Sequence, residues 1–305
     1  MMRPLVSVII PNYNHAKYLE ERLDSILKQT YSNIEIIILD DCSTDNSVTV
    51  IDRYRNNKFV SHIIINEKNS GLTFSQWNKG FSLAKGDLIW IAESDDKCDI
   101  HMLEKLVFEF EKHQDCVLAF SRSIRFDDSG NTYNIRNWTC EKEHYNGNDF
   151  ICKYMLMGNA VVNASSALFA KRALANIKDD YKSFKGAGDR LFWIYIAEKG
   201  SVSIINKQMN YFRQHGKNST SRWYLLGNNQ KEDRVIYNYI CKGFRISIYK
   251  KIYSYILYTR RYIYNNQFMD DEIKKDIKKV WGINKHLDFF LIGFNYILNL
   301  ILRKR

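Results

Sequence analysis

The sequence predicts an α/β fold with a mostly parallel, doubly wound sheet, followed by a helical C-terminal extension. Two observations carry this prediction. Across residues 1–113, short continuous apolar runs alternate with segments whose apolar residues recur at helical spacing. The connections between these segments are short, as expected for repeated β-α-β units with right-handed crossovers and parallel strands.

Four apolar runs are predicted to form strands, of which the first, second and fourth are expected to be buried. They are rich in β-branched residues, and hydrophobicity that is continuous rather than alternating is typical of parallel strands covered on both faces. The runs are LVSVII at 5–10, which Pro11 closes, IEIIILD at 34–40, VSHIII at 60–65 and DLIWIA at 87–92.

Helices are predicted between and after these strands. The segment at 16–29 (AKYLEERLDSILKQ) repeats its leucine and isoleucine residues at the spacing that places them on one helical face. Further helices are expected at 71–86, where Gly71 and Gly86 mark the ends, at 100–113, and at 190–200. The segment at 211–215 is strand-like, so Arg213 and His215 should project to the same face.

Length and charge predict two parts, a nearly charge-balanced domain at 1–221 and a basic helical extension at 222–305. The chain has 305 residues and a formal net charge of +11. From Arg222 onward there are 17 Lys/Arg against 7 Asp/Glu, so the extension holds about +10 of this excess. Such a basic segment favours an anionic partner, either nucleic acid or an acidic membrane surface. A solvated helical surface is the simpler alternative.

The six cysteines contain no C-x-x-C pair. This argues against zinc and redox motifs and is typical of a reduced, cytoplasmic setting. The N-terminal segment MMRPLVSVIIPNYN does not have the shape of a signal peptide, because its apolar run is short and ends at Pro11.

Polar loops follow three of the predicted strands: PNYN after the first, DDCSTD after the second and ESDD after the fourth. In open α/β sheets, ligands bind at the carboxyl ends of the strands. The chain contains neither G-x-G-x-x-G nor the P-loop pattern, which argues against a dinucleotide fold or a P-loop nucleotide site.

Asp95 and Asp96 in the third of these loops predict a metal site. A divalent cation bound to carboxylates can bridge the protein to a diphosphate. The alternative is that the acids only favour the start of the following helix. Asp99 alone would be enough for that, which favours the metal.

Four strings, VSVIIPNYN, DDCSTD, GDLIWIAESDD and GAGDRLFW, resemble in order and spacing the family 2 inverting glycosyltransferases, which have the A-type nucleotide-sugar-binding fold. The resemblance covers roughly residues 4–221. It implies that the domain at 1–221 is the catalytic domain of an enzyme of the bacterial surface-polysaccharide type.

The resemblance implies roles for individual residues. Asp189 matches the catalytic base, Asp96 the metal ligand, and His215 a position near the metal or the diphosphate. Arg213 is expected to contact a phosphate or the acceptor. The nucleotide-binding positions are Pro11 and Tyr13 at the base, Asp41 at the uracil ring or its equivalent, Asn78, and Asp95 near the ribose or the diphosphate.

The sequence departs from the family pattern at three positions. Trp77 stands before Asn78 where family members often have Arg. Gly188 precedes Asp189 where Glu is frequent. Glu93 begins the acidic motif where Asp is frequent.

These roles imply a hexosyltransferase that uses Mn²⁺ or Mg²⁺ and moves a sugar from a nucleotide-diphosphate donor, with UDP favoured, to a hydroxyl of a glycan or lipid-linked acceptor. Inversion needs a single displacement and one protein base. The alternative function is a nucleic-acid- or membrane-binding module built on the basic extension. The extension carries no RNA-binding signature, so no nucleic-acid partner is expected.

The last segment, 286–305, predicts attachment to a membrane. The apolar stretch at 287–302 is interrupted only by a polar stripe and ends in three basic residues. As a helix it would span about 24 Å, shorter than the ~30 Å hydrocarbon core, so it should lie in the interface at the inner face of the cell membrane. Packing on the catalytic domain or across a homodimer is the alternative.

Overall fold

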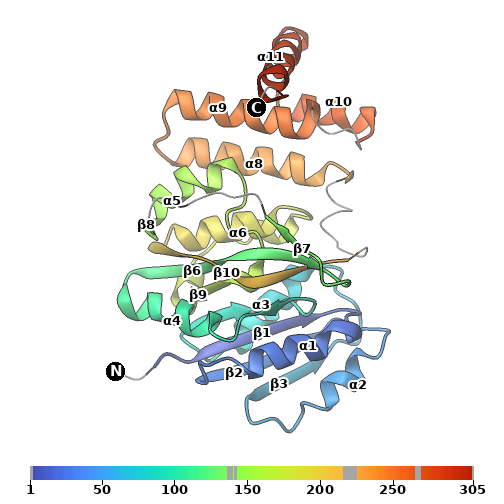
Figure 1. Cartoon of the computed structure of the whole chain (residues 1–305), viewed down its shortest axis with the longest axis vertical. Helices are drawn as coiled ribbons and strands as arrows, with labels where there is room; N and C mark the ends of the chain where they lie inside the picture. The colour runs from blue at the N-terminus through green and yellow to red at the C-terminus, as the bar shows by residue number, and fades with distance from the viewer. Residues whose placement is uncertain (1–2, 136–139, 141–142, 216–224, 265–268, 304–305) are drawn as a thin grey trace. The chain divides into compact units, whose positions relative to one another are not determined.

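The structure, a computed structural model, describes residues 3–135, 140, 143–215, 225–264 and 269–303 (Figure 1). The chain divides into two compact units. The first comprises Met1–Gly147, Val161–Lys182 and Trp193–Gly216. The second comprises Asn148–Ala160, Ser183–Phe192 and Lys217–Arg305, so it contains two mid-chain segments that the sequence assigned to the catalytic domain.

The first unit holds one mixed sheet. Among the described residues its strands follow the order β3-β2-β1-β4-β9-β6-β10-β5, with β7 beside β6 and β8 beside β10 (Figure 1). The strands are β1 (Val6–Asn12), β2 (Ile34–Asp40), β3 (Val60–Ile65), β4 (Leu88–Ile91), β5 (Lys97–Cys98), β6 (Cys116–Asp127), β7 (Thr132–Asn134), β8 (His144–Asn146), β9 (Ala167–Ala170) and β10 (Ser201–Gln214).

The four predicted strands form the parallel half of this sheet. β1 lies between β2 and β4 and is parallel to both, with Val6 opposite Ile34 on one side and Leu88 on the other. β2 is in turn parallel to β3. β9 is antiparallel to both β4 and β6, whereas β6 and β10 are again parallel. The predicted mostly parallel α/β sheet is therefore confirmed.

Helices cover both faces of the sheet. On one face, α1 (Ala16–Leu27), α2 (Ser47–Asp52) and α4 (Met102–Lys112) pack their buried apolar residues against alternate residues of the strands. On the other face lies α3 (Thr73–Leu83), whose approach to β1 depends on a glycine. A Cβ on Gly80 would lie only 2.5 Å from Ile9 Cγ2, so a larger residue would push α3 off the sheet.

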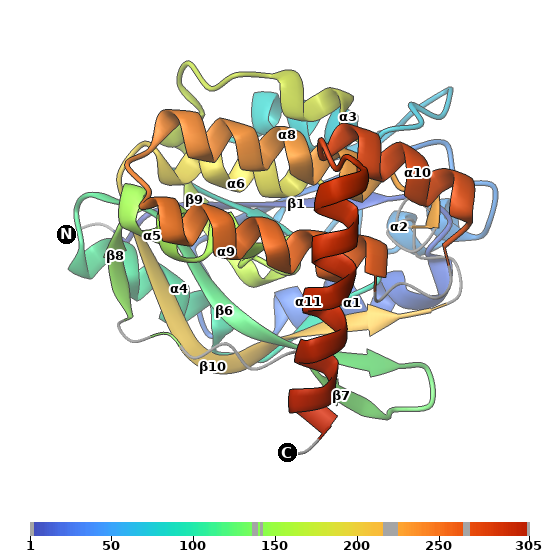
Figure 2. The same ribbon diagram turned by 90° about the horizontal axis from the view of Figure 1, so that it is seen from above.

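The second unit is helical among its described residues, which confirms the predicted helical C-terminal region. It contains most of α5 (Gly147–Lys153), the start of α6 (Gly188–Ala197), and then α8 (Asn228–Gly243), α9 (Ile248–Thr259), a π-helical turn (Arg260–Tyr264), α10 (Asp271–Val280) and α11 (Lys285–Arg303). Figures 1 and 2 show α8 and α9 side by side.

Trp281 is the centre of this helical packing. It is buried, and its indole N–H donates to the Gln230 carbonyl at 3.0 Å. Its own carbonyl accepts a hydrogen bond from the Tyr255 hydroxyl at 2.6 Å. α8 and α9 are therefore joined to the residue that ends α10. Of the described helices, none is both long and apolar enough to cross a bilayer.

Candidate functional site

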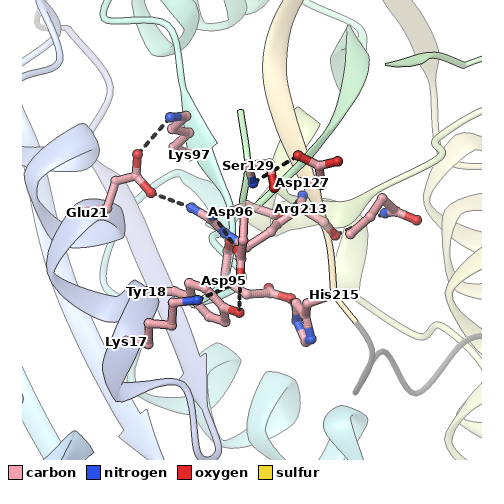
Figure 3. A network of polar contacts seen from close by, with 12 residues as sticks. Lys17, Tyr18, Glu21, Asp95, Asp96, Lys97, Asp127, Ser129, Arg213 and His215 are labelled. Atoms are coloured by element: carbon pink, nitrogen blue, oxygen red, sulfur yellow. Dashed lines mark hydrogen bonds and ion pairs between the residues drawn. The ribbon is translucent and has the colours of Figure 1, made fainter. Parts of the chain in front are cut away.

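The carboxyl ends of β1 and β4 and the end of β10 bring two histidines and one aspartate together in the first unit. His15 follows β1, Asp95 follows β4 and His215 follows β10. One ligand atom from each residue lies within 4.8 Å of the others. His215 Nε2 and Asp95 Oδ2 are 3.0 Å apart, and Figure 3 shows this pair beside Tyr18. His15 Nδ1 lies 2.8 Å from the Ser94 hydroxyl.

The electrostatics of this cluster favour an ionised Asp95. Burial alone would raise the pKa of Asp95, but the hydrogen bond to His215 and the charges of His15 and His215 lower it below its ordinary value. One carboxylate and two imidazoles are a ligand set that suits a divalent transition metal. The residues present therefore fit the predicted cation.

Asp96 is enclosed in the protein. Only 1% of it is exposed, and its Oδ2 accepts hydrogen bonds from Ser165 Oγ at 2.6 Å and Asn163 Nδ2 at 2.9 Å. Its Oδ1 accepts from the Arg213 backbone N–H at 3.0 Å. Burial, together with the neighbouring Asp95 charge, raises the pKa of Asp96 to about 7. Asp96 thus ties β10 and the turn before β9 to the loop after β4.

Arg213 is buried in the first unit, with 6% of its surface exposed, and Figure 3 shows the polar network around it. Its Nε donates to the Asp95 carbonyl at 2.7 Å, and its two terminal nitrogens form ion pairs with Glu21 and Asp128. The guanidinium carbon lies 4.5 Å from the ring centre of Tyr18. The predicted contact of Arg213 with phosphate or acceptor stays a prediction. In this structure its partners include carboxylates, a carbonyl and the aromatic rings of Tyr18 and Phe126.

The predicted base-binding residues lie at the ends of β1 and β2. Pro11 is buried within β1, and Tyr13 follows the strand with 46% of its surface exposed. Asp41 is buried, and its Oδ1 accepts hydrogen bonds from Asn66 Nδ2 and Gln76 Nε2, each at 2.7 Å, and from the Ser70 N–H at 2.9 Å. Asp41 therefore holds the segment that leads from β3 into α3.

Two of the departures from the family pattern contact each other. Trp77 on α3 is buried and donates its indole N–H to Glu93 Oε1 at 3.1 Å. Burial and the charges of Asp95 and Asp96 raise the pKa of Glu93 to about 8.

The predicted nucleotide-binding residue Asn78 accepts a hydrogen bond from the Tyr181 hydroxyl at 3.1 Å.

The predicted base Asp189 lies in the second unit, in the first turn of α6. Its Oδ1 accepts from the Arg190 N–H at 2.7 Å and its Oδ2 from Asn159 Nδ2 at 2.8 Å. Burial raises the pKa of Asp189 to about 6, and the Asp233 charge contributes in the same direction. A carboxyl group with such a pKa can accept a proton at neutral pH.

α8 holds the segment that leads into α6. The Glu232 carboxylate accepts hydrogen bonds from three successive backbone N–H groups, those of Lys185 at 2.7 Å, Gly186 at 2.8 Å and Ala187 at 2.7 Å. The next residue, Asp233, forms a buried ion pair with Arg190, which follows Asp189 directly.

Three residues of the site, His15, Glu232 and Asp233, were not predicted from the sequence. His15 carried a usable signal, because it continues the polar loop PNYN at the carboxyl end of the first strand. Glu232 and Asp233 carried none, because their partners lie more than forty positions away in the chain.

The fold and the comparisons with known proteins define this chain as a glycosyltransferase. The model of glycosyl transferase family 2 matches residues 7–176, which is more than half of the chain, and the chain belongs to that family.

Several relatives carry names of the same class. The chain is 39% identical over 135 residues to the glycosyltransferase GlyG of Streptococcus pneumoniae (43% of this chain, 44% of the relative). It is 30% identical over 286 residues to the chondroitin synthase of Pasteurella multocida (91% and 28%) and 30% identical over 277 residues to the uncharacterized glycosyltransferase MJ1057 of Methanocaldococcus jannaschii (86% and 92%). The chain spans less than half the length of the first curated relatives it matches.

Solved structures share the fold at low identity. Staphylococcus aureus TarS 1-349 in complex with UDP-GlcNAc superposes with a TM-score of 0.61 at 18% identity, covering 87% of this chain and 73% of that one. The mannosyltransferase PcManGT of Pyrobaculum calidifontis, in complex with GDP-Man and Mn²⁺, gives a TM-score of 0.60 at 15% identity, covering 98% and 81%.

Proposed function

We propose that this protein is a metal-dependent, inverting glycosyltransferase that moves a hexosyl group from a nucleotide-diphosphate sugar, with UDP favoured, to a hydroxyl of a glycan or lipid-linked acceptor in surface-polysaccharide biosynthesis. The observation that carries this proposal is the cluster of His15, Asp95 and His215 at the carboxyl edge of the sheet. Support comes from the chondroitin synthase relatives and from the nucleotide sugars in the TarS and PcManGT structures.

In this proposal Asp95 and His215, with His15 beside them, would hold the cation. When bound, the cation neutralises negative charge that grows on the departing diphosphate. The imidazole nitrogens favour a transition metal such as Mn²⁺ over Mg²⁺, which prefers oxygen ligands. Asp96 accepts hydrogen bonds from Ser165 Oγ and from the Arg213 backbone N–H, and so helps to fix the loop that carries Asp95.

Asp189 is the proposed base. In a single displacement the acceptor hydroxyl must lose its proton as it attacks the anomeric carbon, and one carboxylate is enough for this step. The hydrogen bonds from Asn159 and from the Arg190 backbone hold that carboxylate in one orientation.

Two measurements test the proposal. Thermal stabilisation by a panel of nucleotides, with Mn²⁺ and with a chelator, should reveal a diphosphate nucleotide that stabilises the protein only with the metal. Nuclear magnetic resonance of the product from an α-linked donor should show a β-linked sugar. Nucleotide binding that does not change with the metal would contradict the metal assignment, and a retained anomeric configuration would contradict inversion.

We further propose that the protein works in the cytoplasm, attached peripherally to the inner face of the cell membrane. The support is a set of exposed apolar residues on α9 and α11, among them Tyr249 at 82% and Phe289 at 83% exposure, in a strongly basic region. The side chains from residue 295 onward lie outside the described part of the chain, so the polar stripe predicted there stays a prediction. A homodimer across this surface is the alternative that flotation with liposomes would distinguish.

A further inference from the structure

A cavity of about 440 Å³ opens between α8, α9 and α11 in the second unit. Its volume lies in the range of ~300–1,000 Å³ that is usual for sites that bind small organic ligands. All of its walls belong to the C-terminal extension, and none of the residues assigned to metal, donor or proton transfer lines it.

The walls of this cavity are mostly apolar. Leu291 of α11 is only 2% exposed, whereas Ile248, Ile252 and Phe290 are more than half exposed. Covering exposed apolar surface is favourable because it removes that surface from contact with water. The cavity therefore favours a hydrocarbon ligand that continues from its wall onto the exposed side chains.

Two cations line the same cavity. Arg234 of α8 lies 5.1 Å from the ring centre of Trp281 and 5.5 Å from that of Tyr255, and Lys251 of α9 donates to the Cys241 carbonyl at 2.9 Å. In the part of the chain that the structure describes, no ion pair joins either cation to a carboxylate, and no acidic residue lines the cavity. The sequence from 234 to 269 contains no Asp or Glu at all.

We propose that this cavity binds a hydrocarbon chain of an anionic membrane lipid, with the phosphate of the head group at Arg234 and Lys251. The cavity has an apolar wall beside two cations that form no ion pair with a carboxylate among the described residues. It therefore complements an amphiphile that has one negative charge. The inference goes beyond the proposed transfer reaction, because binding of the lipid needs neither donor nor metal.

The charge of the extension argues against a second copy of the chain as the occupant. The extension carries 17 Lys/Arg and 7 Asp/Glu, so two copies facing each other through this surface would bring like charges together. A free phosphate would satisfy the cations but would leave the apolar wall exposed.

The test uses the full chain and single-chain lysophosphatidylglycerol below its micelle concentration, with binding measured by calorimetry. Lysophosphatidylcholine has a similar hydrocarbon chain without the net negative charge, and glycerol phosphate has the charge without the chain. We expect lysophosphatidylglycerol to bind at least about tenfold more tightly than either, a difference of ~1.4 kcal/mol.

Variants locate the binding. Arg234→Gln combined with Lys251→Gln should weaken the binding of lysophosphatidylglycerol at least about tenfold, a change of ~1.4 kcal/mol, while Arg234→Lys combined with Lys251→Arg should preserve it. Ile256→Trp should weaken it without a change of charge, because the larger side chain fills the cavity. The matched control, Lys242→Gln with Lys250→Gln, removes the same charge from exposed positions outside the cavity and should have little effect.

Three results would overturn the proposal. Equal losses in the cavity variant and in the control would show diffuse attraction to a basic surface. Equal affinity for glycerol phosphate would show that the hydrocarbon chain plays no part. A dimer that forms with rising protein concentration, in a protein that does not bind lysophosphatidylglycerol, would show that a second copy covers this face. Because these measurements need no turnover, they remain valid if the proposed transfer reaction is wrong.

Discussion

Arg190 on α6 and Asp233 on α8 form an ion pair in which both side chains are almost fully buried, with 2% and 8% exposed. Arg190 also donates from Nε to the Met155 carbonyl at 3.1 Å. Arg190 directly follows the proposed base Asp189, so the pair anchors the first turn of the helix that carries the base. The helical extension thus helps to position the proposed base.

The first prediction concerns this pair. Asp233→Ala should lower the free energy of unfolding by about 3–5 kcal/mol, because it leaves a buried guanidinium without its counter-charge. Urea unfolding followed by circular dichroism measures the effect. The control is Asp276→Ala, which breaks an exposed pair with Lys231 and should cost less than about 1 kcal/mol. Equal effects of the two variants would contradict the importance of the buried pair.

The second prediction concerns Glu232, which holds three successive N–H groups before α6. Glu232→Ala should leave these donors without their acceptor and let the base shift. Turnover should fall at least about tenfold while the KM for the donor changes little, the pattern of a residue that acts only through the transition state. A loss of stability with kcat unchanged would show that Glu232 has a structural role only.

The third prediction separates Asp95 from Asp96. Asp95→Asn removes the negative charge from the cluster with His15 and His215, so Mn²⁺-dependent binding of the nucleotide should be lost. Asp96→Asn should keep that binding but lower stability by about 1–3 kcal/mol, because the new amide faces the Arg213 N–H as a second donor. Calorimetry of Mn²⁺ and nucleotide on both variants measures this. The reverse pattern would make Asp96 the ligand, as the sequence alone predicted.

The parallel half of the fold was predictable because each of its strands is a short, mostly apolar run that can be recognised in the sequence alone. The runs at 34–40 and 60–65 are mostly apolar, and the structure has β2 and β3 at these same residues. β9 was not predictable in the same way. The run ALFA is short, and only its pairing with β4 and β6, far apart in the chain, makes it a strand.

The residues of the candidate site differ in the same way, because some could be predicted from a local motif and others could not. Asp95 and His215 lie where short motifs end a strand, so their neighbourhood could be inferred from the position of each motif. The environment of Asp96 could not, because Asn163 and Ser165 reach it from almost seventy positions away. For the same reason, no local sequence pattern indicated that α8 holds the segment that leads to Asp189.

The fourth prediction concerns Asp189 as a base. Asp189→Asn keeps the size of the side chain but cannot accept the proton, and base catalysis is typically worth ~10²–10⁴ in rate. Turnover at saturating donor should fall on that scale while nucleotide affinity changes little. A collapse of nucleotide affinity with turnover retained would instead make Asp189 a binding residue.

The fifth prediction follows from the raised pKa of the same residue. Burial raises the pKa of Asp189 to about 6 in the folded protein, with the Asp233 charge acting in the same direction and the Arg190 charge against it. The base must be ionised to act, so kcat should fall about tenfold for each pH unit below this pKa and level off above it. The Asp189→Asn variant should lose this dependence.

The raised pKa of Asp189 also determines how the stability of the protein changes with pH. The unfolded carboxyl has a pKa of about 3.9, so between roughly pH 4 and 6 the folded state binds more protons and stability falls as the pH rises. Asp189→Asn removes this loss, and above pH ~6 the variant should be more stable than the native protein by about 1–3 kcal/mol.

The new amide can be accommodated, because Asn159 Oδ1 is buried without a hydrogen-bond partner and a flip of the Asn159 amide would let that oxygen accept from the new amide. Urea unfolding of both proteins from acid to neutral pH measures the difference, which should vanish near pH ~4. A variant that is less stable at neutral pH would show that the Asp189 carboxylate is a stabilising group and not a base held at the expense of stability.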